Sequence, residues 1–127
     1  MNISKIETYL NSILDNVVSM NTFFGSYPER ETIQEEWNDM VFVEIPNGIE
    51  DREAFGEGTV LVWLFARPLS SGRKNVATMS RMEESLNDVI KTASDPIYRI
   101  SRRDTYTDYD PSIKWHANVV EIILKVF

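Results

Sequence analysis

The sequence predicts an α+β fold in which a mostly antiparallel sheet carries two helices on one face. Two stretches with helical periodicity alternate with two pairs of strand-like stretches, in the order helix, strand, strand, helix, strand, strand. Strands that follow one another in pairs favour antiparallel hairpins, with the helices on one side of the sheet. Because the chain has 127 residues, we expect residues 1–127 to form a single domain.

The first element is an amphipathic helix over residues 2–20, in which apolar side chains recur at the spacing of one helical face. Only Lys5 is basic on its polar face, so we expect the helix to pack on the sheet and not on a membrane surface. Residues 21–39 follow as an acidic connection without the ligand spacing of a calcium loop. Ile33 and Trp37 are expected to attach this connection to the body of the protein.

The first pair of strands spans residues 40–45 and 58–68. Pro46 ends the first strand, and the long acidic loop 47–57 leads into the second. Phe55 stands alone among the charges of this loop, and it either anchors a partner or folds back on the loop itself. The strand 58–68 is apolar on both faces, so it requires cover on both sides.

The second half of the chain repeats the helix and the strand pair. The helix is predicted over 75–93, and the strands over 97–106 and 113–127. In the third strand we expect Tyr106 to face the core and Arg102 to mark a bulge or an edge. The last strand is again apolar on both faces. Two helices cover one face of a sheet, so the second face needs a loop, a rolled sheet or another subunit.

Composition and motifs exclude several kinds of chemistry. The net charge is −7 and the thirteen Lys and Arg are scattered, which disfavours nucleic acid as a partner. There is no cysteine and no apolar run of 18 residues, so we expect neither disulfides nor a membrane-spanning helix. His116 is the only histidine, and the ionisable residues lack the paired spacing that catalysis needs. We therefore expect no enzymatic activity, no metal site and no cofactor.

The order of elements resembles that of the phage tail-terminator, or tail-completion, proteins. The matching features cover nearly the whole chain: the opening helix with its capping-box form at Ser4–Glu7, the strand MVFVEIP, the long loop, the strand GTVLVWLFARP, the helix NVATMSRMEESLNDVI and the closing strand WHANVVEIILKVF. The resemblance is one of the order and spacing of elements, so it assigns no role to any single residue. The acidic stretch 29–39 has no counterpart in it. It implies a structural protein of the bacterial host cytoplasm or the virion, which forms a ring and contacts other tail proteins.

A second hypothesis is an intracellular module whose sheet binds a small molecule or a peptide. Trp63, Phe65 and Trp115 are the aromatic residues that would line such a pocket. Together with Phe55 they are also the predicted partner contacts of the tail-assembly hypothesis. The two hypotheses differ in what meets the second face of the sheet, which is another subunit in the first and a ligand in the second.

Overall fold

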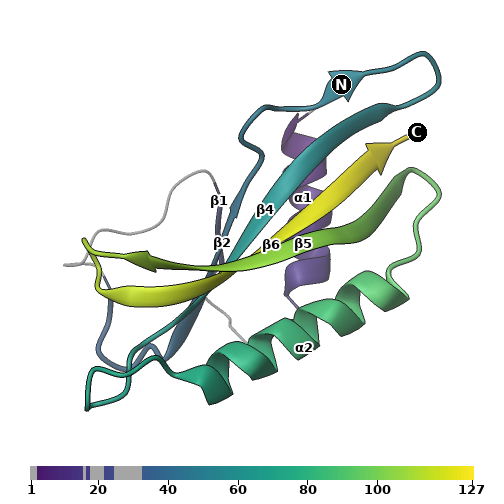
Figure 1. Cartoon of the computed structure of the whole chain (residues 1–127). Coiled ribbons are helices and arrows are strands. Elements are labelled where there is room, and N and C mark those ends of the chain that lie inside the picture. The colour runs from purple at the N-terminus through teal and green to yellow at the C-terminus, as the bar shows by residue number, and fades with distance from the viewer. Residues whose placement is uncertain (1–2, 16, 18–21, 25–32) are drawn as a thin grey trace.

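The computed structural model describes residues 3–15, 17, 22–24 and 33–127 of the chain (Figure 1). Their elements in chain order are α1 (Ile3–Leu14), β1 (Thr22–Phe24), β2 (Asp39–Glu44), β3 (Glu50–Asp51), β4 (Gly56–Ala66), α2 (Val76–Thr92), β5 (Tyr98–Asp110) and β6 (Trp115–Val126). The strands form one six-stranded sheet in the order β1-β2-β4-β6-β5, with the short β3 paired to β4. Every pair is antiparallel except β1 with β2.

Both helices lie on the same face of this sheet, as the sequence predicts (Figure 1). We call this side the helix face. The central strand β4 presents Val60, Val62 and Leu64 to it, and all three are fully buried. The same hydrophobic cluster contains Ile6, Leu10 and Leu14 of α1, Met82 and Leu86 of α2, and Val120, Ile122 and Leu124 of β6. Each fully buried aliphatic side chain of this kind stabilises the fold by about 1.5–3 kcal/mol.

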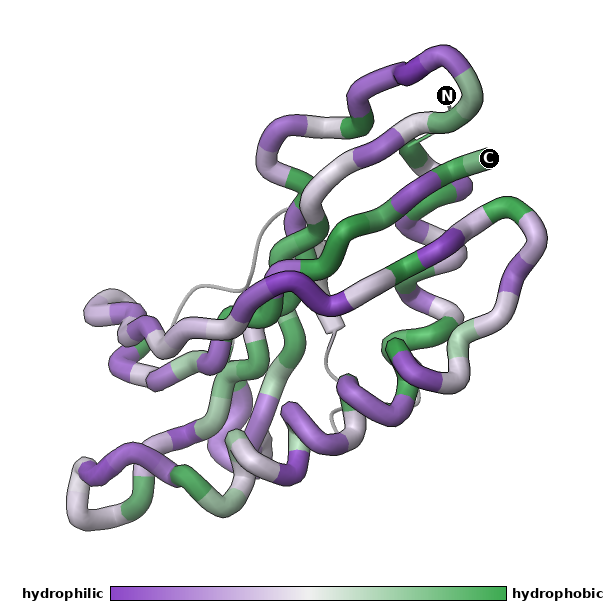
Figure 2. Tube along the Cα trace, turned by 45° about the vertical axis from the view of Figure 1, so that its right-hand side comes forward, coloured by the Kyte–Doolittle hydropathy of each residue, from purple (hydrophilic) through white to green (hydrophobic). Residues whose placement is uncertain are grey.

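The opposite side of the sheet, which we call the open face, has a second and smaller cluster. Its buried members come from β2, β4, β6 and the turn before β6: Met40, Phe42, Phe65, Ile113, Trp115 and Ala117. Ile33 and Trp37 pack against this cluster from the segment that precedes β2. A loop of the same chain therefore covers one part of the open face. Figure 2 shows the hydrophobic residues gathered along the middle strands, whereas the middle of β5 is strongly hydrophilic.

Several predicted boundaries differ from the structure. The first helix ends at Leu14 and not at residue 20, because the chain turns where the Val17 amide donates to the Leu14 carbonyl at 2.9 Å. Residues 2, 16 and 18–20 of the predicted helix, and residues 21 and 25–32 of the predicted acidic connection, lie outside the described residues. The predicted connection contains strand β1, and the predicted long loop contains strand β3.

Strand β5 also differs, because it continues to Asp110 instead of ending at Tyr106. Pairing with β6 is kept up to a turn in which the Asp110 carboxylate accepts hydrogen bonds from the Ser112 and Ile113 amides. The bulge expected at Arg102 is present, between Arg102 and Asp104. It shifts the strand by one residue and places Tyr106 on the open face, so the prediction that Tyr106 faces the helix-side core was wrong.

Candidate functional site

Arg67 holds the segment 33–38 against the open face. Its Nε donates to the Trp37 carbonyl at 2.7 Å, and its Nη2 donates to the Gln34 carbonyl at 2.8 Å. Its guanidinium also lies over the Trp115 ring, 4.9 Å from the centroid. One side chain at the end of β4 thus satisfies two loop carbonyls and stacks on the core beneath them. Ile33 and Trp37 were predicted to attach this segment to the body of the protein, and Arg67 holds the segment in that position.

Two of the four predicted partner contacts are core residues of the open face. Phe65 is 0% exposed and Trp115 is 3% exposed, so neither side chain is accessible in the single chain. Trp63 is half-buried, with its ring stacked 5.8 Å from that of Phe65 and its Nε1 donating to Glu44 at 3.2 Å. Trp115 also lines a pocket of about 380 Å³, whereas Trp63 and Phe65 are absent from its lining residues. The three aromatics therefore form one packed layer and do not surround a common pocket.

Phe55, the fourth predicted contact, folds back onto the end of β6. Its ring lies 5.7 Å from that of Phe127, and the Lys125 Nζ lies 5.2 Å above it. This contact is one wall of a groove of about 490 Å³ at the end of the sheet. Apolar and aromatic residues from α1, from the start of β5 with the residue before it, and from the end of β6 with the residue after it complete most of the lining: Ile6, Ile97, Tyr98, Val126 and Phe127. The Phe55 ring is thus half-buried against the end of β6 and not against its own loop, and its role as a partner anchor stays a prediction.

A part of the open face beyond segment 33–38 remains accessible. Leu61 of β4 and Ile123 of β6 are half-buried there, and Tyr106 of β5 is 43% exposed. Carboxylates surround this tyrosine, and burial together with Glu121, Asp108 and Glu44 raises the pKa of its hydroxyl. The accessible area combines apolar side chains with charges, which is the composition of many protein–protein contact surfaces.

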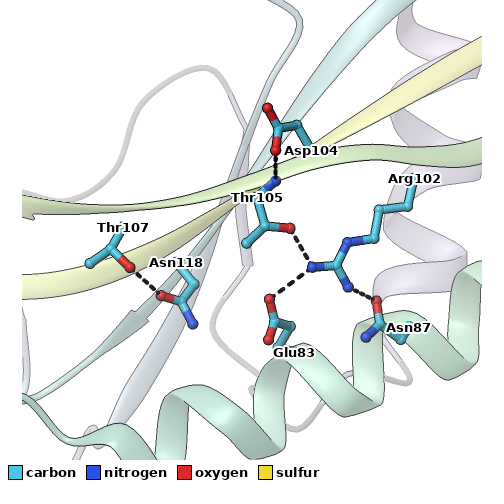
Figure 3. Close-up of polar contacts among 7 residues, drawn as sticks. All are labelled: Glu83, Asn87, Arg102, Asp104, Thr105, Thr107 and Asn118. Carbon is cyan, nitrogen blue, oxygen red and sulfur yellow. Dashed lines mark hydrogen bonds and ion pairs between the residues drawn. The ribbon is translucent and has the colours of Figure 1, made fainter.

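On the opposite side of the sheet, the helix face, Arg102 of the outer strand β5 binds helix α2. The guanidinium donates to Glu83 at 3.0 Å and also to Asn87 and Thr105 (Figure 3). In the sequence, Arg102 stood out only because it breaks the alternation of the strand. Its hydrogen bonds to α2 were not predicted, since the two partners lie fifteen and nineteen residues away. A pattern of alternation cannot reveal such long-range bonds. Arg102 therefore fixes the bulged part of β5 to the helix layer.

Among the described residues, no group of three or more His, Cys, Asp or Glu side chains is placed to hold a metal ion. None of the described helices has the length and hydropathy that crossing a membrane requires. His116 lies on the helix face of β6, with its ring 4.8 Å from that of Tyr109. No protein-family model matches the chain, and no curated protein matches it.

Proposed function

We propose that this chain is a non-enzymatic assembly protein of the tail-terminator kind, which self-associates into a ring and contacts other tail proteins. The observation that supports it best is the incomplete cover of the open face. Strands β4 and β6 carry apolar side chains on both faces, the helices cover one, and segment 33–38 covers part of the other. Leu61, Ile123 and Tyr106 are then available to a neighbouring subunit.

We propose a ring because the order of elements resembles that of the tail-terminator proteins. The α+β fold with both helices on one face is consistent with this order. A cyclic oligomer needs two different surfaces that fit each other, and the open face is one candidate. The proposal assigns no catalytic residue, cofactor, nucleic acid or membrane partner. It places the protein in the cytoplasm of a bacterial host or in the virion.

The experiment is to compare Ile123→Gln with wild type by negative-stain electron microscopy at tens of micromolar. We expect closed rings for the wild type and a loss of most rings for Ile123→Gln, because an amide in the contact opposes desolvation. The matched control is Val76→Gln, which makes the same change at an exposed apolar residue of α2 on the helix side. The role of the open face would be contradicted if the wild type formed no rings, or if Ile123→Gln formed rings as often as Val76→Gln.

A second candidate function is the binding of a small molecule or a peptide, and the groove beside Phe55 supports it. The groove has the volume of an ordinary ligand site and is lined by Phe55, Tyr98 and Phe127. A fragment screen by ligand-detected NMR tests this function, with Phe55→Ala as the variant that should lose the signal. Fragments that bind both forms equally would exclude this groove as the site.

A further inference from the structure

We propose that the outer edge of β5 pairs with the same edge of a second copy of this chain, in an antiparallel arrangement centred on Arg103 and Asp104. This contact is made through the backbone edge of β5 and does not involve Leu61 or Ile123, so it holds or fails separately from the proposed ring. Three features of β5 support it: its charges, the position of its bulge and the hydrogen bonds of its backbone.

Strand β5 is the last strand of the sheet, and β6 pairs with it along one side only. No other described strand lies against its outer edge. Its charges divide the strand in two. Residues 98–103 contain three arginines and no carboxylate, whereas residues 104–110 contain three aspartates and no lysine or arginine. An antiparallel copy of such a strand brings the basic half of each chain beside the acidic half of the other.

One register fits these charges. If Arg103 of one copy lies opposite Asp104 of the other, then Arg99 lies opposite Asp108. Two-fold symmetry repeats both pairs, so four arginine–aspartate pairs form across the contact. The same register places Ser101 opposite Tyr106, which would cover a tyrosine that is exposed in the single chain.

The bulge makes this register compatible with the faces of the sheet. Arg99 lies opposite Lys125 of β6 and Asp108 lies opposite Ala117, so both side chains are on the open face. Without a bulge, two residues separated by an odd number of positions would lie on opposite faces, and the pair could not form. A shift of the register by two residues no longer aligns the two bulges. The bulge therefore selects the register that the charges select.

Two backbone amides of β5 are also placed to take part in this contact. The Asp104 carboxylate accepts a hydrogen bond from the Thr105 amide at 2.8 Å (Figure 3), and the Asp108 carboxylate accepts one from the Tyr109 amide at 2.7 Å. In the proposed register Thr105 lies opposite Arg102 and Tyr109 lies opposite Tyr98. The two amides would then donate to the carbonyls of the second copy, which frees both carboxylates to pair with its arginines.

The charges also explain why other strands would not add to this edge. Charged side chains and bulges are common devices that keep exposed edge strands from pairing at random. A strand of another sequence would not supply opposite charges to Arg99, Arg103, Asp104 and Asp108, whereas a second β5 in this register supplies one to each of these four. The edge is thus specific for its own copy.

Charge reversal tests the contact. One variant carries Arg99→Asp and Arg103→Asp, and the other carries Asp104→Arg and Asp108→Arg. Alone, each variant places like charges opposite one another, and we expect the dimer to dissociate at least about tenfold more readily at low salt. Mixed in equal amounts, the two variants are complementary at all four pairs, and we expect wild-type affinity to return. Sedimentation equilibrium measures all three dissociation constants.

The control variant carries Arg73→Asp and Lys91→Asp, which lower the net charge as much as Arg99→Asp and Arg103→Asp do, at exposed positions away from β5. It should associate like wild type. Recovery in the mixture also shows that both reversed variants are folded. The β5 contact is excluded if the wild type is monomeric, if the reversed variants associate like wild type, or if their mixture stays dissociated. Rings that persist in both reversed variants, together with dissociation constants equal to that of wild type, would support the proposed function while excluding this contact.

Discussion

Arg67 is the residue on which the cover of the open face depends. It makes two charged hydrogen bonds to loop carbonyls and stacks on Trp115. Methionine keeps the apolar stem but leaves both carbonyls without this donor, so Arg67→Met should lower the free energy of unfolding by about 1–3 kcal/mol. Urea denaturation measures the change. Arg73→Met is the control at an exposed loop position and should change stability by less than about 0.5 kcal/mol.

A loss from Arg67→Met no larger than that of the control would show that segment 33–38 stays in place without the arginine. Ile33 and Trp37 would then hold the segment through apolar packing alone.

Tyr9 leads to a prediction about alkaline pH. Its ring stacks on Tyr98 at 4.3 Å, and its buried hydroxyl has no hydrogen-bond partner among the described residues. Burial, followed by the charges of Asp95 and Tyr98, raises the pKa of the hydroxyl above 10.0. The folded state therefore holds this proton more tightly than the unfolded state. The resulting stability is complete below pH 10.0 and is lost as the pH rises through the folded-state pKa.

Tyr9→Phe removes both the unpaired hydroxyl and this titration. We expect it to leave stability at pH 7 unchanged or raise it by up to about 1 kcal/mol. Its melting temperature should fall less than that of wild type between pH 8 and pH 10.5, as differential scanning calorimetry would show. Tyr109→Phe, at an exposed tyrosine, is the control. A marked loss of stability at pH 7 in Tyr9→Phe would mean that the hydroxyl is hydrogen-bonded after all.

At the scale of elements, local signals predicted α2 to within one residue at each end. The Asn75 side chain caps its first turn, accepting from the Thr78 amide at 3.2 Å, and Pro96 follows its end. The end of strand β5 was harder to predict, because pairing with β6, and not a local sequence signal, keeps the chain extended to Asp110. The bulge then reverses the faces of every later residue, so alternation read along the sequence placed Tyr106 wrongly.

The candidate site was predictable only in part for the same reason. The apolar character of both faces of β4 and β6 could be read from the sequence, and so could the need for a cover. The sequence also singled out Trp63, Phe65 and Trp115, but their large rings fill the layer under segment 33–38 instead of projecting from it. The accessible residues Leu61, Ile123 and Tyr106 depend on how far that segment reaches, which only the folded chain defines.

The whole molecule presents three surfaces to solvent or to partners. The helix face is closed by α1 and α2, the open face is closed in part by segment 33–38, and the outer edge of β5 has no strand beside it among the described residues. The last two surfaces are assigned to contacts between copies. Each assignment has its own variant, so the ring and the β5 contact can be judged independently.

The ring and the β5 contact both require self-association, which the mass of the wild-type protein in solution reports. Light scattering coupled to size exclusion, from low to high micromolar concentration, gives that mass without any variant. We expect an average mass that rises with concentration and levels off at a fixed multiple of the 14.7 kDa chain. A mass that stays at 14.7 kDa over the whole range would contradict both the ring and the β5 contact.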